Sequence, residues 1–368
     1  MKKHIISSGL LKNSIIQLLI ILNCIGCVSE YKAKGIDEIT DILVVEGIIT
    51  DDESIIKLSQ SKNITDEDNA PISISDAIVY VECDDGTKTQ PGLYEPSDVW
   101  PRIGRYTIKT GKLNPERKYR LKIEFDRHEY RSDFSYPINT PEIDSVFWRK
   151  SGKGQPVNIY VATHSAEDEV LFYRWSYRED WEIWPEYYPA PGFPQQCWSS
   201  ANSRDILIGS AEKTEFGQLT DKIFEALPSD KRWSVLYRIA VKQNAISKRA
   251  HDYFTNIKKN SQNMGSIFAP TPSELRGNII CTTDPKRPVI GYIDISSTTQ
   301  KTKYISRFDY LYERNNLDCS VYTAQQLIEK YGTIPIAYVK IGPDDYILLV
   351  CVLCEGTAPK PDDWPDNY

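Results

Sequence analysis

The chain has 368 residues, with 51 acidic residues against 44 Lys and Arg, and its formal net charge at pH 7 is −7. Cleavage after residue 26 would remove three Lys and no acid, leaving 342 residues with a charge of −10. Because nucleic acids are bound by basic surfaces, this acidic balance argues against nucleic acid as a partner. The length predicts two or three domains.

The N-terminus has the pattern of an export signal. Three Lys and no acid precede an apolar run at 15–25, which is shorter than the roughly 20 residues that a membrane-spanning helix needs. Gly26 then precedes Cys27, as in the bacterial lipobox, where cleavage leaves a cysteine that receives lipid. We therefore expect a lipoprotein signal peptide over 1–26, lipidation of Cys27 and a polar tether over 27–41. An ordinary secretory signal cut nearby is the alternative.

The segment 42–145 has the alternation of a β-sandwich. In "AIVYVECDDG", Val79, Val81 and Cys83 fall on one face of a strand that ends in an Asp-Gly turn. We expect Cys83 to point into the core.

A corner motif indicates the type of sandwich. In "LNPERKYRLKIEF", Leu113, Pro115 and Tyr119 stand in the order seen at the corner of fibronectin type III and related sandwiches. There the Tyr hydroxyl bonds to backbone a few residues upstream, which here is the region 113–116. The pattern predicts an N-terminal Ig- or fibronectin-like sandwich. An ordinary turn followed by a strand is the alternative.

A second domain is expected over 146–368. The Lys-, Gly- and Pro-rich stretch "KSGKGQP" marks a boundary near 140–155. Beyond it, strand-like segments such as "VNIYVATH" and "PVIGYIDIS" outnumber helical ones and lack βαβ alternation. The fold class is therefore mainly β, with a sandwich followed by a larger antiparallel β domain.

Two helices are expected in this second domain. The main one is amphipathic and lies near 245–260, where apolar residues recur at helical spacing. A shorter one runs from an N-cap at Thr323 to a stop at Gly332.

An aromatic, Pro-rich stretch provides the candidate binding residues. Trp181, Trp184, Tyr187 and Tyr188 lie in "DWEIWPEYYPAPG", where strand periodicity breaks and where so many rings are hard to bury. Exposed aromatic rings in a loop are typical of surfaces that bind sugars, peptides or partner proteins. The alternative is that this loop folds over the second domain and plugs its core.

Six cysteines remain after loss of Cys24 and lipidation of Cys27. They are Cys83, Cys197, Cys281, Cys319, Cys351 and Cys354. An exported compartment permits disulfides, and 15 pairings are possible for six cysteines. The Cys351-x-x-Cys354 spacing sits at a strand end rather than at a helix start, so structural disulfides are favoured over a redox pair. We expect at least one of these two to bridge to a distant residue.

The order of motifs resembles one family along nearly the whole chain. The motifs include "LVVEGIITD", "PEIDSVFW", "RIAVKQNAISKRAHDYF", "GSIFAPTPSELRGNIIC" and "CVLCEGTAPKPDDWP". Together with the signal peptide, they resemble the Bacteroidota outer-membrane lipoproteins catalogued as domain of unknown function 4249. The resemblance implies an outer-membrane address, with the leaflet left open, and a position beside TonB-dependent transporters. It implies no activity and no site residues.

The sequence contains none of the residue patterns of metal sites or catalytic nucleophiles that we considered typical of enzymes. His128, His164 and His251 fall in different elements without metal-ligand spacing, and no nucleophile elbow follows a strand, so we expect no metal, no cofactor and no catalytic residue. The expected function is a lipid-anchored binding or accessory module that acts with a TonB-dependent transporter in nutrient uptake, with a glycan or peptide as cargo. The alternative is an extracellular polymer-degrading hydrolase.

Overall fold

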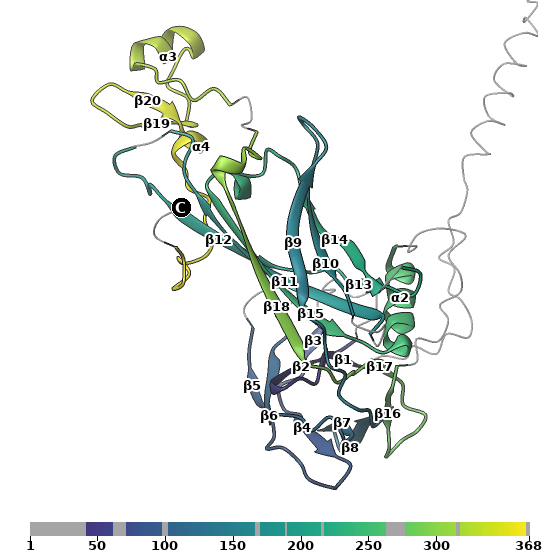
Figure 1. The fold of residues 1–368 in the computed structure, drawn as a ribbon. Helices are drawn as coiled ribbons and strands as arrows, with labels where there is room; N and C mark the ends of the chain where they lie inside the picture. Colours follow the sequence, from purple (N-terminus) through teal and green to yellow (C-terminus); the bar gives the residue numbers. More distant parts are fainter. Residues whose placement is uncertain are drawn as a thin grey trace, which may run out of the picture. The chain divides into compact units, whose positions relative to one another are not determined.

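The structure is a computed structural model, in which the chain divides into Met1–Thr40 and Asp41–Tyr368. It describes residues 42–61, 71–97, 102–165, 170–187, 190–214, 217–262, 277–313 and 317–365. The expected signal peptide, the lipidated Cys27 and the tether lie outside the described residues. The described part is mainly β, with several antiparallel sheets and few helices, as predicted (Figure 1).

The first sheet of an N-terminal sandwich has the strand order β17-β1-β2-β6-β5, and β3 also pairs with β2. Its strands are β1 (Leu43–Ile48), β2 (Asp52–Gln60), β3 (Ile72–Ser73), β5 (Leu93–Glu95), β6 (Arg105–Gly111) and β17 (Val289–Gly291). The β1–β2 pairing is antiparallel, whereas β17 joins β1 in parallel.

The second sheet of this sandwich has the order β16-β8-β7-β4. Its strands are β4 (Ile78–Cys83), β7 (Tyr119–Phe125), β8 (His128–Ser132) and β16 (Ile279–Cys281). Both sheets contribute to one apolar core, which includes Ile56 and Ile108 from the first sheet and Val79 and Ile123 from the second. Cys83 is 7% exposed and faces this core, as the alternation of its strand predicted.

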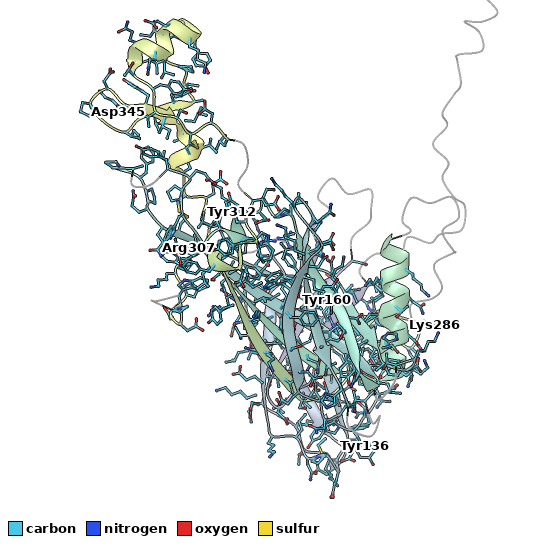
Figure 2. All side chains as sticks on the ribbon, turned by 45° about the horizontal axis from the view of Figure 1, so that its top comes forward. Tyr136, Tyr160, Lys286, Arg307, Tyr312 and Asp345 are labelled. Carbon is cyan, nitrogen blue, oxygen red and sulfur yellow. A yellow bond between two sulfur atoms is a disulfide. The ribbon has the colours of Figure 1, made fainter. Side chains whose placement is uncertain are left out.

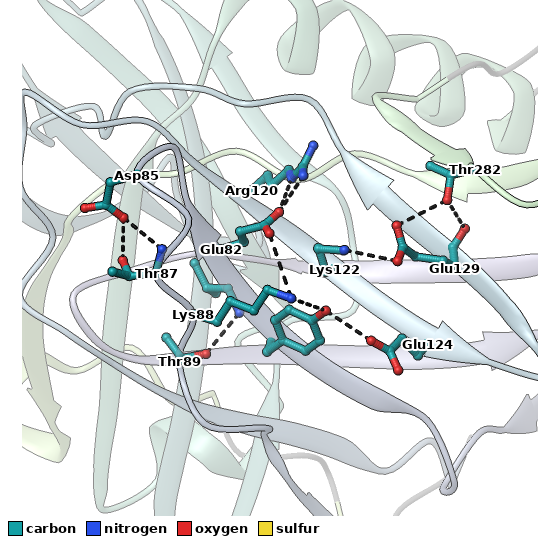
Figure 3. Close-up of polar contacts among 12 residues, drawn as sticks. Glu82, Asp85, Thr87, Lys88, Thr89, Arg120, Lys122, Glu124, Glu129 and Thr282 are labelled. Carbon is teal, nitrogen blue, oxygen red and sulfur yellow. Dashed lines mark hydrogen bonds and ion pairs between the residues drawn. The ribbon is translucent and has the colours of Figure 1, made fainter.

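The outer face of the second sheet carries paired charges (Figure 3). Arg120 of β7 contacts Glu82 directly across the β4–β7 ladder, with 2.5 Å between nitrogen and oxygen. Lys122 of the same strand bonds to Glu129 of β8 at 3.1 Å. These opposite charges alternate with the buried apolar residues, so ion pairs cover the outer face of the sheet and the other face meets the core.

The predicted corner is confirmed. The backbone N–H of Asn114 donates to the hydroxyl of Tyr119 at 2.9 Å. Tyr119 also exchanges backbone hydrogen bonds with Ser135. The hydroxyl therefore holds the turn that leads into β7, as in a sandwich corner.

The expected division at residue 145 needs a correction. Strands β16 and β17 come from the segment 279–291, which sequence analysis placed in the second domain, and both pair with strands of the first sandwich. Periodicity shows which face of a strand is buried, but it does not show which sheet the strand joins. The first sandwich is therefore discontinuous in sequence.

A second sandwich follows, with one sheet in the order β14-β10-β9 and another in the order β12-β11-β15-β18. Its strands are β9 (Ile143–Lys150), β10 (Val157–Thr163), β11 (Phe172–Ile183), β12 (Cys197–Asn202), β13 (Leu207–Ser210), β14 (Leu219–Ala226), β15 (Leu236–Ala245) and β18 (Thr298–Ser306). β13 pairs with the first residues of β11, and β12 pairs with its last residues. Both sheets share one apolar core, which includes Ile159 of β10 and Trp175 of β11.

Both predicted helices are present. α2 (Lys248–Gln262) buries Ala250 and Tyr253 against Phe172 of β11 and Tyr292. α3 (Ala324–Tyr331) begins with a capping box at its N-cap, Thr323, and ends at Gly332, which has the positive φ of 77° expected at a helix stop.

Residues 317–353 form a small unit, here called the C-terminal module. It contains α3, the two-stranded sheet β19 (Tyr338–Lys340) and β20 (Tyr346–Leu348), and α4 (Leu349–Val352) (Figure 1). Its buried cluster is small and comprises Ile347, Cys351 and Val352 together with Ala190. The disulfide Cys319–Cys351 within the module compensates for this small core, and Cys197–Cys354 ties the residue directly after the module to β12.

Candidate functional site

The aromatic stretch is more ordered than the sequence indicated. β11 continues to Ile183, so Trp181 lies inside a strand, between Ser199 of β12 and Tyr237 of β15. Its ring is half-buried against the second core, and the Arg232 guanidinium lies 4.8 Å from the ring centre. The expectation that Trp181 belongs to an exposed loop is therefore wrong. Pairing with β12 on one side and with β15 on the other keeps this part of the chain extended.

The remaining aromatic residues separate from one another. Trp184, just after the strand, is 37% exposed, and its indole N–H donates to Glu182 at 2.6 Å. Tyr187 packs on the cluster of the C-terminal module, and its backbone N–H donates to the carbonyl of Cys351 at 2.9 Å. Tyr188 lies outside the described residues. Of the three predicted residues that the structure describes, only Trp184 combines exposure with a fixed ring.

Three carboxylates are buried in the same part of β11. Glu179 is 3% exposed, Asp180 is 1% exposed and Glu182 is fully buried. Because neighbouring residues of a strand point to opposite faces, burial of both Glu179 and Asp180 means that both faces of this sheet are covered here. The core covers one face. The other is covered by residues 355–365, here called the C-terminal strap.

Glu179 faces the core side. It accepts a hydrogen bond from the Tyr237 hydroxyl at 2.8 Å, and Arg232 lies 3.8 Å away. Burial raises the pKa of the Glu179 carboxyl, although Arg232 and Tyr237 act in the opposite direction. Burial likewise raises the pKa of Tyr237, and the nearby Glu179 adds to the rise. This arrangement stabilises a buried acid by hydrogen bonding.

Asp180 and Glu182 face the strap side. Arg238 of β15 donates to Asp180 at 2.8 Å and contacts Asp363 of the strap at 2.7 Å. Although burial lowers it, the pKa of Arg238 is raised overall, because the guanidinium bonds to Asp363 and Asp180. The indole N–H of Trp364 donates to Glu182 Oε2 at 3.1 Å. The other oxygen of Glu182 accepts from Trp184 and from the side-chain amide of Gln196.

The strap begins at the Cys197–Cys354 disulfide and passes beside β12. Ala358 and Trp198 form an isolated antiparallel bridge, and the Thr357 N–H donates to the Ser199 hydroxyl at 3.2 Å. Gly356 approaches β12 so closely that an added Cβ would lie 2.5 Å from the Cβ of Cys197. A residue with a side chain would force the strap away from the strand, which explains the glycine.

Exposed aromatic residues continue beyond Trp184 onto the segment after β18, where Figure 2 labels Arg307 and Tyr312. Arg307 lies 5.0 Å from the ring centre of Trp184 and 5.0 Å from that of Phe308. Phe308 is 57% exposed and Tyr310 is 82% exposed. We call Trp184, Arg307, Phe308 and Tyr310 the aromatic rim.

Local structure fixes the aromatic rim. Ser306 and Asp309 form a capping box around the short 3-10 helix η4 (Arg307–Asp309). Tyr310 then adopts a φ of 54°, a left-handed conformation that bulky residues rarely take. Arg307, Phe308 and Tyr310 were not predicted as site residues, although "SRFD" contains the Ser-x-x-Asp pattern of a capping box.

The cysteine expectations are met in part. Cys351 and Cys354 both bridge to distant residues, as predicted, whereas Cys83 and Cys281 are free and buried. These two belong to β4 and β16, the opposite edges of a four-stranded sheet. Three strand spacings separate them by roughly 14 Å, twice the reach of a disulfide of about 7 Å.

Among the described residues, no group of three or more His, Cys, Asp and Glu is arranged to hold a metal ion. A pocket of about 600 Å³ lies between β14 and the end of α2, and basic Lys222 and Lys258 line it together with Glu225. Its described lining contains no Ser, Cys or His. No helix among the residues that the structure describes is long and apolar enough to cross a membrane.

Comparison with known proteins identifies the lineage. Residues 28–302 match the family described as Domain of unknown function (DUF4249). The chain belongs to this family. The matched region ends before the C-terminal module and the strap. No curated protein matches the chain. Among solved structures, the chicken interferon gamma receptor alpha chain is similar over 55% of this chain and 88% of its own, at 9% identity and a TM-score of 0.16.

Proposed function

We propose that this family member is a lipid-anchored protein of the outer membrane that binds a partner and performs no covalent chemistry. The partner is a TonB-dependent transporter, and the role is accessory to nutrient uptake. The lipobox pattern at Cys27 supports the anchor. Two disulfides support an oxidising compartment outside the cytoplasm.

The aromatic rim carries the proposal. Exposed rings are costly to keep in water unless they contact something, and aromatic and Arg side chains dominate the binding energy of protein interfaces. Arg307 holds two rings of the rim together, and the Glu182 carboxylate fixes the indole of Trp184. Rings that are ordered before binding lose little conformational entropy when a partner arrives.

The buried carboxylates favour binding over hydrolysis. A hydrolase needs an acid and a base that reach a substrate from a cleft. Glu182 instead has both oxygens engaged by Trp184, Gln196 and Trp364.

The test is a pull-down from native membranes with the double substitution Phe308→Ala and Tyr310→Ala. Both side chains are exposed, so we expect folding to be unchanged. Two aromatic anchors worth about 2 kcal/mol each would lower affinity about a thousandfold, so the transporter should be lost from the eluate. The matched control is Phe134→Ala with Tyr136→Ala, which removes two exposed rings that also lie under cations, Arg120 and Lys118.

Equal recovery of the transporter with both double variants would exclude the aromatic rim as the binding surface. The anchor is tested separately with a labelled fatty acid. Wild type should incorporate the label and Cys27→Ala should not. Label on the variant would refute lipidation at Cys27.

A further inference from the structure

The C-terminal strap buries little of its own surface. Of its residues, only Trp364 is buried, at 5% exposure, while the Asp363 side chain is 77% exposed. The strap pairs with β12 through a single bridge at Ala358. Segments with few buried apolar groups open locally far more often than the whole protein unfolds. The strap is therefore the part of this face most easily displaced.

The surface beneath the strap is polar and specific. Trp364 inserts its indole against Arg238, 5.5 Å from the guanidinium to the ring centre, and donates its N–H to Glu182. The preceding residue, Asp363, offers a carboxylate to the same Arg238. Lys360 lies over the ring of Trp198 at 5.9 Å. Without the strap, Arg238 and Glu182 would each lose a partner while held in place by Asp180, Trp184 and Gln196.

We propose that this surface is a docking site for a peptide segment of a partner protein in which an acidic residue precedes Trp, and that the strap occupies it as an internal competitor. The strap shows which chemistry the site accepts. A carboxylate meets Arg238, and an indole N–H placed next to it meets Glu182. The site adjoins the aromatic rim, because Glu182 bonds to Trp184 of the rim as well as to Trp364 of the strap. The proposal does not depend on the proposed transporter partner.

The Cys197–Cys354 disulfide explains why the strap, and not an external peptide, occupies the site. Cys354, ten residues before Trp364, is bonded to Cys197 of β12, so the Trp can move at most roughly 35 Å from that point. A segment confined in this way has an effective concentration in the millimolar range. An external peptide with the same contacts binds weakly unless the internal Trp is removed or the partner adds contacts elsewhere.

The test measures binding of a fluorescently labelled peptide with the sequence of residues 357–366, TAPKPDDWPD, by anisotropy. The chain carrying Trp364→Ala should bind this peptide at least tenfold more tightly than wild type, because its own strap no longer competes. A peptide with Ala in place of Trp should bind that variant at least tenfold more weakly. Adding Arg238→Gln to Trp364→Ala should weaken binding of the unaltered peptide by a similar factor.

If Trp364→Ala prevents folding, a second variant still tests the proposal. Asp363→Asn keeps the buried ring and removes only the contact with Arg238, so it should bind the peptide more tightly than wild type. Equal binding by wild type and both variants, or no binding by either variant, would overturn the proposal. A wild-type dimer that Trp364→Ala does not form would show instead that the occupant is the strap of a second copy, and would overturn the assignment to a partner protein.

Discussion

The first sandwich and the C-terminal module achieve stability by different means. The sandwich has a continuous apolar core, in which Ile56, Val79 and Ile123 are completely buried, and its two cysteines remain free thiols. The module has a buried cluster of a few residues and leaves Ile336 fully exposed. One disulfide, Cys319–Cys351, lies within it, and a second, Cys197–Cys354, anchors the residue that directly follows it. Cross-links thus occur where buried apolar area is too small to offset the entropy of the chain.

The largest effect should follow from cutting the link between the module and the second sandwich. Cys197→Ala with Cys354→Ala opens a loop with a sequence separation of 157 residues. The chain-entropy estimate for such a loop is roughly 5 kcal/mol. We expect hydrogen exchange to show lost protection in β19 and β20 while the first sandwich stays protected.

The control for this experiment is Cys83→Ala with Cys281→Ala, which also removes two cysteines but no cross-link. It should leave the protection of the module unchanged. If the module is equally protected after loss of Cys197 and Cys354, the disulfide is not what stabilises it.

The converse experiment breaks the core of the sandwich. Ile123→Ala deletes a fully buried side chain and should cost about 3 kcal/mol. Denaturant unfolding should show this loss in the first sandwich, and protection of the module should not change. A loss of protection shared equally by both regions would mean that they unfold as one unit.

A smaller effect tests the corner of the sandwich. Tyr119→Phe removes the hydroxyl that accepts from the Asn114 N–H and should cost about 1 kcal/mol. The exposed Tyr136→Phe serves as control and should cost nothing measurable. An equal effect of the two changes in denaturant unfolding would contradict the role of the corner.

The smallest effect concerns the strap. The Arg238 guanidinium, hydrogen-bonded to Asp363, lowers the pKa of that carboxyl. Because the pKa of the Asp363 carboxyl is lowered, its contact with Arg238 stabilises the docked strap fully at a pH above the ordinary carboxyl pKa. This stabilisation is lost as the pH falls through the lowered pKa. The fluorine NMR signal of 5-fluorotryptophan at Trp364 should therefore shift toward its solvent-exposed position on acidification. Asp363→Asn should remove this pH dependence, and a transition that persists in the variant would assign it to another group.

Local patterns in the sequence predicted what depends on local physics. Alternation located β4 and the inward direction of Cys83, capping residues located α3, and the turn before Tyr119 located the corner. The same patterns did not assign β16 and β17 to the first sandwich, because the choice of sheet depends on contacts that are distant in sequence. They also placed Trp181 in a loop, which is wrong, because pairing with β12 and β15 overrides the local signal of a Pro-rich stretch.

The discontinuity of the first sandwich has a consequence for how the chain is made. Val289 must reach Leu43 before β1 is covered, and Ile279 must reach Ser132 before β8 is covered. A chain synthesised from its N-terminus therefore carries two open strand edges until nearly all of the second sandwich has been added. Open edges pair readily with other chains, and contacts this distant in sequence close slowly. A nascent or truncated chain that stops before residue 279 would expose both edges, so its yield would depend on chaperones that shield them.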